Sequence, residues 1–497
     1  MGRDFLKRYT LSELSERHPA LCSLLALVTD SSIYLLGAAF LGAGNFILIP
    51  LYTRYLRPSE FGVYTLVDLA LLFAVAISTL RLEVAYLKWF GEPKDSAAQE
   101  LLSTVLAGSG LCGAAAGVVL WCVLGSATGL RWLPSENHHF VPLLLPLVLL
   151  ENLQVILLSN LRAQRRATAY SSSAAVRLLI IVLASLYFVA VSRQGVTGIF
   201  LGRLAGDLGA VVLLLFFCRD MIKLRFRGAL LRPMLSFSVP LIWTGFAVML
   251  MDGSGRYFLS KYSSMEQIGM YGAAVKICAI FPMLITQPFG IAWGGALFQI
   301  VKMEDARETY SRILGYVFLG SLTIALVLSA FAPTLATLFT TKAYAAAIPI
   351  IPLIFLVRAV SILEYPASTG IYLRGRTGWF AAIYSAGLVV TFTLCRILVP
   401  VYGMQGAAWS WLAGWAAIAA LMLAISQKYY PLRLDLKFFA LPAACWVLLL
   451  AGQQGYLGTI LQFSWTAKIS LAVGITLGGL AICVRDLRNI GREAAAE

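Results

Sequence analysis

Ionisable side chains inside long apolar segments are the residues of this chain best suited to chemistry. A charged group at hydrocarbon depth is costly unless it is paired or hydrated, so each such residue is a candidate for function. One guanidinium group can bind two phosphate oxygens at once, and a lysine ammonium supplies a compact positive charge. Six basic and five acidic side chains qualify: Arg177, Arg203, Arg256, Lys276, Arg358 and Arg396, and Asp68, Glu151, Asp207, Asp252 and Glu364.

The spacing of these residues separates two pairs from the rest. Arg203 with Asp207, and Arg256 with Asp252, are four positions apart, which places both members of each pair on one helical face. Mutual neutralisation explains this spacing as well as a substrate-binding role does. Both interpretations stay open for these four residues.

Lys276 and Arg358 are the strongest candidates for lining an aqueous, phosphate-binding cavity. Lys276 has no ionisable partner nearby in the sequence, and Glu364 lies too far along the helix to pair automatically with Arg358. Arg177 and Arg396 lie near segment ends, where a long side chain can extend to the interface. We therefore expect a structural role for both.

Carboxylates at depth are candidates for coupling transport to an ion. Glu151 is central and has no local partner, so it is the first candidate to exchange a proton or bind Na⁺, followed by Asp207. Asp252 and Glu364 complete this set. We expect no cofactor, no metal site and no catalytic residue: the His138–His139 pair has no further ligand, and no phosphate-binding G-x-x-x-x-G-K-[ST] loop occurs.

Composition indicates the elements that must position these charges. Hydrophobic residues make up 60% of the chain, charged residues 13%, and the mean hydropathy is +0.81. Spanning the hydrocarbon takes roughly 20 apolar residues per helix. Fourteen segments qualify, near 31–52, 61–82, 101–124, 140–161, 172–191, 198–218, 234–256, 269–298, 313–336, 348–371, 379–399, 403–426, 438–455 and 466–484. The sequence therefore predicts an all-α polytopic membrane protein.

The net charge of +15 follows the same topology. Most basic residues outside the apolar segments fall on one side of the predicted membrane, and basic residues near helix ends stay cytoplasmic. This asymmetry predicts that both termini are cytoplasmic and argues against a nucleic-acid partner. The outside loops are short, the longest being about 125–139.

A repeated motif divides the chain into two halves. The segment Tyr55–Tyr64 reappears loosely as Tyr262–Tyr271, 207 positions later, and Leu161–Arg165 is echoed by Leu373–Arg376 at an offset of 212. Duplicated helical bundles are typical of alternating-access transporters. We predict five regions: a lead-in (1–29), an N-lobe of six helices (30–218), a basic cytoplasmic linker (219–233), a C-lobe of six helices (234–426), and two further helices with a tail (427–497).

Several of these segments resemble a known family. The run Leu235–Ile242, the segments Arg256–Leu259 and Ile268–Tyr271, and the first-half segments Tyr55–Tyr64 and Leu161–Tyr170 resemble Wzx-type polysaccharide and O-antigen flippases. These belong to the multidrug/oligosaccharidyl-lipid/polysaccharide exporter superfamily. The family often has Asp directly before the arginine of the seventh segment, where this chain has Gly255.

The resemblance carries implications for structure and function. It implies two pseudo-symmetric six-helix lobes in a V shape with two added helices, in a bacterial plasma (inner) membrane. It implies translocation of undecaprenyl-pyrophosphate-linked oligosaccharide for exopolysaccharide, capsule or lipopolysaccharide O-antigen. Expected partners are this lipid-linked oligosaccharide, membrane lipids, a polysaccharide polymerase and a chain-length regulator.

Two other classes of function remain. A lipid II flippase or a multidrug/cation antiporter would share the architecture, although cationic residues at depth disfavour a site for cationic drugs. A membrane-bound polymerase or glycosyltransferase is disfavoured, because such enzymes are expected to need a large external loop or soluble domain. We expect a transporter and not an enzyme.

Overall fold

The computed structural model describes residues 36–432 except 38, 43, 45, 91–94, 127–134, 223–225 and 304, and also describes Trp446. Over this part of the chain the regular elements are helices. The predicted lead-in at 1–29 and the predicted helices near 438–455 and 466–484 lie outside it, apart from Trp446.

The described chain forms two successive sets of helices. The first set comprises α4 (Ile49–Tyr55), α5 (Pro58–Thr79), α6 (Leu82–Phe90), α7 (Asp95–Gly125), α9 (Leu144–Ala163), α10 (Ala167–Ser185) and α11 (Gly195–Cys218). The second comprises α12 (Gly228–Tyr262), α13 (Met265–Ile277), α14 (Gln287–Ile300), α15 (Ala306–Ala330), α16 (Ala332–Phe339), α17 (Ile351–Ser361), α18 (Glu364–Ala367), α19 (Thr369–Leu373) and α20 (Gly378–Tyr429). We call these sets the first and second halves.

The helices have the length and composition of membrane spans. Among the described residues, nine helical stretches are long and apolar enough to cross a bilayer, and the bent helix α12 raises this number to ten. Their most apolar windows have mean hydropathies of 1.8 to 2.5. The prediction of an all-α polytopic membrane protein is confirmed.

Helix α20 is a helical hairpin. Its 52 residues would extend about 78 Å as a straight helix, far more than a bilayer. Gly403 takes φ 53° and ψ −127°, and the Trp379 indole N–H donates to the Tyr429 hydroxyl at 3.0 Å. The two ends therefore lie together, which matches the separate helices predicted at 379–399 and 403–426.

The backbone repeats between the halves. Arg165 after α9 and Gly375 after α19 both take left-handed φ values, 55° and 63°. In each case the amide of the next residue, Arg166 or Arg376, donates to the carbonyl five positions earlier, at 2.9 and 3.0 Å. This is the same left-handed helix ending twice. The corresponding positions are 210 apart, so the offset of 212 predicted for this motif is corrected by two residues.

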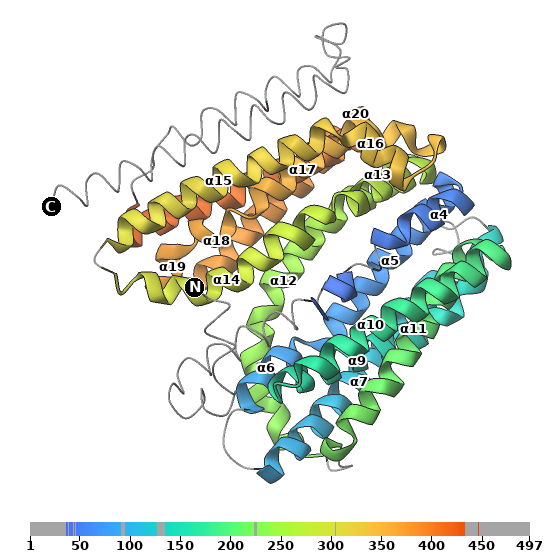
Figure 1. The fold of residues 1–497 in the computed structure, drawn as a ribbon, viewed down its shortest axis with the longest axis horizontal. Helices are drawn as coiled ribbons and strands as arrows, with labels where there is room; N and C mark the ends of the chain where they lie inside the picture. The colour runs from blue at the N-terminus through green and yellow to red at the C-terminus, as the bar shows by residue number, and fades with distance from the viewer. Residues whose placement is uncertain are drawn as a thin grey trace, which may run out of the picture.

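The two halves pack against each other, mainly through α5, α12 and α13. Figure 1 shows the first half in blue to green and the second in yellow-green to orange, with α12 beside both. Helix α5 packs along α13, and α12 contacts α5, α6 and α7 as well as its own half. Helices α4, α13 and α16 meet at one end of the molecule. Both copies of the repeated motif begin at this end of the molecule, which is predicted to face outside.

Two glycines of the repeated motif allow this contact. A Cβ on Gly62 would collide with the carbonyl oxygen of Met265, and a Cβ on Gly269 would collide with that of Pro58. Both residue pairs are related by the offset of 207, so the motif copies pack against each other about a pseudo-two-fold axis. Because glycine has no side chain, the two backbones can approach this closely. We call this contact the glycine crossing.

A strained turn separates α5 from α6. Leu80 and Arg81 take φ values of 51° and 54° in succession, and each such residue other than glycine costs about 1–2 kcal/mol. Helix α6 compensates by burying Leu82 and Tyr86, while the Tyr86 hydroxyl donates to Asn160 of α9 at 2.7 Å.

Candidate functional site

The inner end of the contact between α5 and α13 carries opposite charges. Asp68 lies six residues beyond Gly62 on α5, and Lys276 lies seven beyond Gly269 on α13. At 1.5 Å per residue, both lie about 10 Å along their helices from the glycine crossing. The pseudo-symmetric packing thus brings a first-half acid beside a second-half base.

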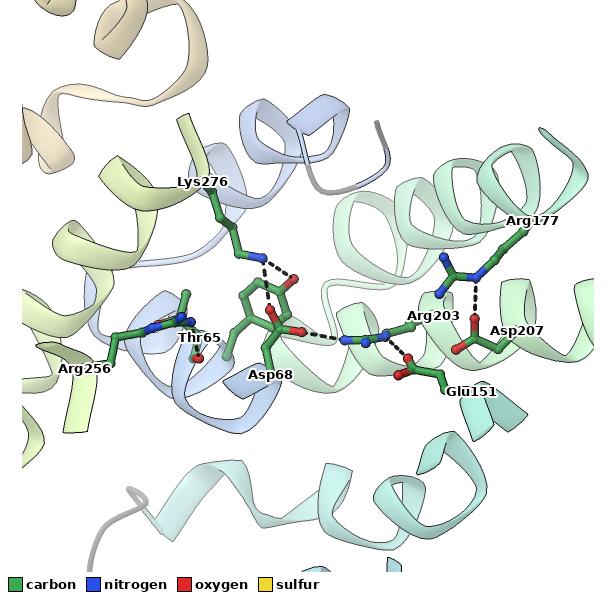
Figure 2. A network of polar contacts seen from close by, with 9 residues as sticks. Thr65, Asp68, Glu151, Arg177, Arg203, Asp207, Arg256 and Lys276 are labelled. Carbon is green, nitrogen blue, oxygen red and sulfur yellow. Dashed lines mark hydrogen bonds and ion pairs between the residues drawn. The ribbon is translucent and has the colours of Figure 1, made fainter. Parts of the chain in front are cut away.

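Four charged groups form one network at this place. The Lys276 ammonium donates to Asp68 Oδ2 at 3.1 Å, and Arg203 of α11 donates to Asp68 Oδ1 at 2.5 Å. The Arg203 Nε–H donates to Glu151 Oε1 of α9 at 2.5 Å. Figure 2 shows Asp68 between the two bases, with Glu151 on the far side of Arg203. We call these four residues the central cluster.

The central cluster is balanced in charge and largely withdrawn from solvent. Its side chains are 12–19% exposed. Lys276 also donates to the Tyr64 hydroxyl at 3.1 Å, and its ammonium lies 4.8 Å from the Tyr64 ring centroid. Two acids and two bases compensate each other, which is what burial at membrane depth requires.

A separate ion pair joins α10 to α11 within the first half. The Arg177 Nε–H donates to Asp207 Oδ1 at 2.6 Å, and the Asp207 side chain is 0% exposed. Its other oxygen, Oδ2, has no hydrogen-bond partner among the described residues. Figure 2 shows this pair beside the one between Arg203 and Glu151. Because its members belong to adjacent helices of one half, the pair fixes their packing.

The second half holds a third ion pair. Arg358 NH1 of α17 lies 3.6 Å from Asp252 Oδ2 of α12. The Trp411 indole N–H of α20 donates to the other Asp252 oxygen at 3.0 Å, and the Arg358 guanidinium lies 4.6 Å from the Trp411 ring centroid. Three helices of this half are therefore joined around one carboxylate.

The remaining candidates have single polar partners. Arg256 of α12 donates to the Thr65 carbonyl of α5 at 3.2 Å, which is a further contact between the halves. Glu364 accepts a hydrogen bond from the Tyr384 hydroxyl at 2.7 Å, and no basic side chain pairs with it among the described residues. Arg396 is exposed on α20.

Mutual neutralisation within one helix, one of the two interpretations of the spacing, does not occur for these pairs. Arg203 and Asp207 share a helix face, but each binds a residue of another helix, and the same holds for Arg256 and Asp252. Inside a bundle a side chain points at the neighbouring helix, so partners four residues along the same helix are further away than partners across the interface. Glu151, which has no partner nearby in the sequence, binds Arg203 of another helix.

Lys276 and Arg358 also pair with residues that are distant from them in the sequence. Both form ion pairs with carboxylates from other helices, so neither stands unpaired in a cavity. Arg177 binds Asp207 instead of extending to the interface. The role of these residues in binding substrate stays a prediction.

Asp68 and Tyr64 are site residues that the sequence does not single out. The sequence marks Asp68 only as a charge at depth, yet it contacts both bases of the central cluster. Tyr64 closes the repeated motif and lies four residues before Asp68, so the two share the face that meets Lys276. That spacing, directly after the motif, is the signal that points to them.

Comparisons with known proteins bear on the family and the fold of this chain. A family model described as polysaccharide biosynthesis protein matches residues 51–291, a range that includes the whole central cluster. No curated protein matches the chain significantly.

Solved structures of transporters share the fold. A structure described as lipid II flippase MurJ in an inward closed conformation has a TM-score of 0.70 and 14% identity, covering 93% of this chain and 99% of that chain. An inward-facing multidrug resistance MATE family transporter of the MOP superfamily has a TM-score of 0.60 and 13% identity, covering 81% and 97%. A MOP superfamily transporter from Pyrococcus furiosus, described as having a binding pocket of reverse polarity, has a TM-score of 0.53 and 14% identity, covering 81% and 95%.

The family match and the fold support the same assignment. All three structures belong to transporters, and the family match concerns polysaccharide biosynthesis. Together they confirm the resemblance found in the sequence: the chain is a multi-pass membrane protein whose fold is similar to those of MurJ and of a MATE family transporter of the MOP superfamily, and residues 51–291 match the polysaccharide biosynthesis family model.

Proposed function

We propose that this protein is a flippase that moves undecaprenyl-pyrophosphate-linked oligosaccharide across the bacterial inner membrane by alternating access. The product would enter exopolysaccharide, capsule or O-antigen biosynthesis. The observation that carries the proposal is the central cluster, in which Lys276 and Arg203 are both held by Asp68 where the two halves meet. The polysaccharide family match supports the choice of cargo.

The cluster suits a pyrophosphate because its bases are already placed and neutralised. The Asp68 and Glu151 carboxylates accept hydrogen bonds from Arg203, and Asp68 also accepts one from Lys276. A pyrophosphate offers the same kind of oxygen acceptors with more charge, and charge-assisted bonds to phosphate are strong in a site withdrawn from water. The headgroup would compete with Asp68 for Lys276 and loosen a contact between the halves, while the polyprenyl chain stays in lipid.

Movement of the halves would then expose the headgroup on the other side. The glycine crossing and the Tyr344 hydroxyl, which donates to the Leu56 carbonyl at 3.1 Å, join the halves at the end predicted to face outside. These contacts would have to separate in the outward-open state. Release of Lys276 from Asp68 removes one of the restraints on that separation.

Glu364 is our candidate for coupling to H⁺ or Na⁺. Of the four carboxylates predicted for this role, Glu151, Asp207 and Asp252 are paired with arginines. Glu364 has only the Tyr384 hydroxyl among the described residues, so its charge is not already compensated. A carboxylate without a basic partner at depth favours binding of a proton or a cation. We further propose that a polymerase and a chain-length regulator act on the exported product.

A leaflet-specific assay tests the function. We expect deletion of the gene to accumulate lipid-linked oligosaccharide on the cytoplasmic leaflet, and wild-type protein to restore surface glycan. Lys276→Ala and Arg358→Ala should insert normally but fail to restore it. The matched control is Arg396→Ala, which removes an exposed arginine and should restore it fully.

Two results would contradict the proposal. One is normal glycan display with both Lys276→Ala and Arg358→Ala. The other is accumulation of lipid II, with unchanged levels of other lipid-linked glycans, after deletion, which would assign the protein to peptidoglycan precursor export instead.

A further inference from the structure

A second polar pocket lies between the halves, away from the central cluster. Helices α5, α6, α9 and α12 line a partly open cavity of about 220 Å³. Val75, Thr79, Arg81 and Glu83 line it from the first half, and Gly245 and Phe246 line it from the second. Arg81 lies in the turn after α5, thirteen residues beyond Asp68, which corresponds to about 20 Å at the helical rise. We call this place the Arg81 cavity.

The Arg81 cavity contains an incompletely satisfied pair of charges. Arg81 NH1 lies 3.6 Å from Glu83 Oε1, and the two side chains are 43% and 13% exposed. At this distance the attraction is electrostatic without a hydrogen bond. The second carboxylate oxygen, Glu83 Oε2, is buried and has no hydrogen-bond partner among the described residues. An orphaned buried acceptor of this kind requires a donor from a ligand or from water.

The strained turn holds Arg81 in this position. Leu80 and Arg81 are both left-handed, a conformation that non-glycine residues keep mainly where surrounding structure demands it, often at functional sites. Gly245 leaves the space that the guanidinium occupies, because a Cβ there would collide with Arg81. Turn and glycine together bring a first-half arginine against a second-half helix.

The depth of the cavity suits a lipid headgroup. Pro58, at the start of α5, is predicted to lie outside, and the 23 residues to Arg81 extend about 35 Å, close to the hydrocarbon thickness. Beyond the turn, the Lys88 ammonium lies 4.0 Å from the Phe237 ring centroid and 4.7 Å from that of Trp89. Lysine with aromatic residues is typical of the membrane interface. Arg81 therefore lies at the level of phosphates in the predicted cytoplasmic leaflet.

We propose that the Arg81 cavity binds the glycosyl phosphate junction of the lipid-linked substrate before the headgroup reaches the central cluster. This inference depends on the proposed function. The Arg81 fork binds phosphate oxygens. Glu83 is an acceptor only, so it requires a donor, and a sugar hydroxyl next to the phosphate supplies one. A phosphate that has no neighbouring hydroxyl group would bind Arg81. The Glu83 carboxylate would then still have no hydrogen-bond donor, and the negative charge of the phosphate would repel it.

Binding of short-chain lipids to the purified full-length protein tests this inference. The probes are farnesyl pyrophosphate with and without an attached glucose, and phosphatidylglycerol, whose phosphate also has hydroxyl neighbours. Arg81→Gln should weaken binding of both farnesyl probes about tenfold, as expected for the loss of a hydrogen bond to a charged group. Glu83→Gln should weaken the glucosylated probe alone, by a similar factor.

Glycine variants provide a matched control for folding. Gly245→Ala displaces the Arg81 guanidinium without removing it, so it should reproduce the effect of Arg81→Gln. Gly320→Ala adds the same methyl group where nothing lies within 4 Å and should bind both farnesyl probes like the wild type. Size-exclusion profiles and apparent Tm values identify any variant that misfolds.

The outcomes separate this inference from the proposed function. If wild-type protein binds neither farnesyl probe, both proposals fail. If it binds the glucosylated probe but Arg81→Gln and Glu83→Gln do not weaken it, only the Arg81 cavity is excluded as the subsite. Equal dependence of phosphatidylglycerol binding on Glu83 would assign the cavity to bulk membrane lipid and overturn the inference.

Discussion

At the scale of single residues, the ion pairs of this protein differ in what they join. Asp207 and Arg177 join two adjacent helices of one half, whereas Asp68 and Lys276 join the halves themselves. In the proposed transport cycle, only the second kind of pair has to break when the halves move apart. The two pairs should therefore respond differently to substitution, in stability and in transport.

Arg177→Gln should lower the free energy of unfolding. The substitution leaves the buried Asp207 carboxylate without its ionic partner, a defect that typically costs about 3–5 kcal/mol. The double variant Arg177→Gln/Asp207→Asn should recover most of this loss, because neither charge then remains. Apparent Tm values in detergent measure both effects, and a double variant as unstable as the single one would contradict the assignment.

The double variant Lys276→Gln/Asp68→Asn should also recover stability, but it should not recover transport. The double variant removes one base and one acid of the central cluster, so its apparent Tm should lie above that of Lys276→Gln alone. Surface glycan should nevertheless stay absent, because the proposed phosphate site would have lost one of its two bases. Recovery of glycan display together with stability would show that the pair serves packing only.

Glu364→Gln tests the coupling role. The amide keeps a hydrogen-bond acceptor for Tyr384 but carries neither charge nor exchangeable proton. We expect substrate to bind the variant normally, while headgroup translocation in proteoliposomes loses its response to an imposed H⁺ or Na⁺ gradient. Glu364→Asp retains the carboxylate and is the control. A gradient response that survives in Glu364→Gln would exclude this residue.

At the scale of elements, the same left-handed helix ending occurs in both halves with different residues. Gly375 adopts this conformation without strain, whereas Arg165 adopts it with a side chain. The surroundings of Gly375 are open, since nothing lies within 4 Å of the position that a Cβ would occupy. Substitutions at these two sites therefore measure how the left-handed backbone conformation affects stability, separately from side-chain packing.

Reciprocal substitutions should have opposite effects on stability. Gly375→Ala should lower stability by about 1 kcal/mol, because alanine is strained at this φ. Arg165→Gly should leave stability equal or raise it by up to about 1 kcal/mol. Apparent Tm values measure both, and a stabilising Gly375→Ala would contradict the described turn.

At the scale of the whole molecule, the glycine crossing decides how closely the halves approach. Each motif glycine faces a backbone carbonyl of the other copy, so the contact has no flexible side chain that could yield. Any substituent must push α5 away from α13. This separation would displace the central cluster as well, because Asp68 and Lys276 lie on the same two helices.

Gly62→Ala and Gly269→Ala should each lower apparent Tm and abolish glycan export in inserted protein. Gly320→Ala is the control, since its added methyl group meets no atom within 4 Å. Export at the wild-type level in both crossing variants would show that the halves do not need this contact.

Much of the architecture followed from the chain's own pattern. Apolar runs such as 140–161 and 198–218 predicted helices that the structure contains, because a span must be long and apolar whatever surrounds it. The motif copies around Gly62 and Gly269 predicted the duplication. The candidate site was predicted as a set of residues, but its connections were not, since Asp68 and Lys276 are 208 positions apart.

The sequence by itself determined that this protein is a duplicated helical membrane bundle with charges at depth, because hydrocarbon thickness and the cost of burying charge act on each segment separately. Only the tertiary structure decided which charges meet. Partners such as Arg203 with Glu151, or Arg358 with Asp252, depend on which helices become neighbours and how each is rotated. Those are properties of the packed bundle, and no single segment contains them.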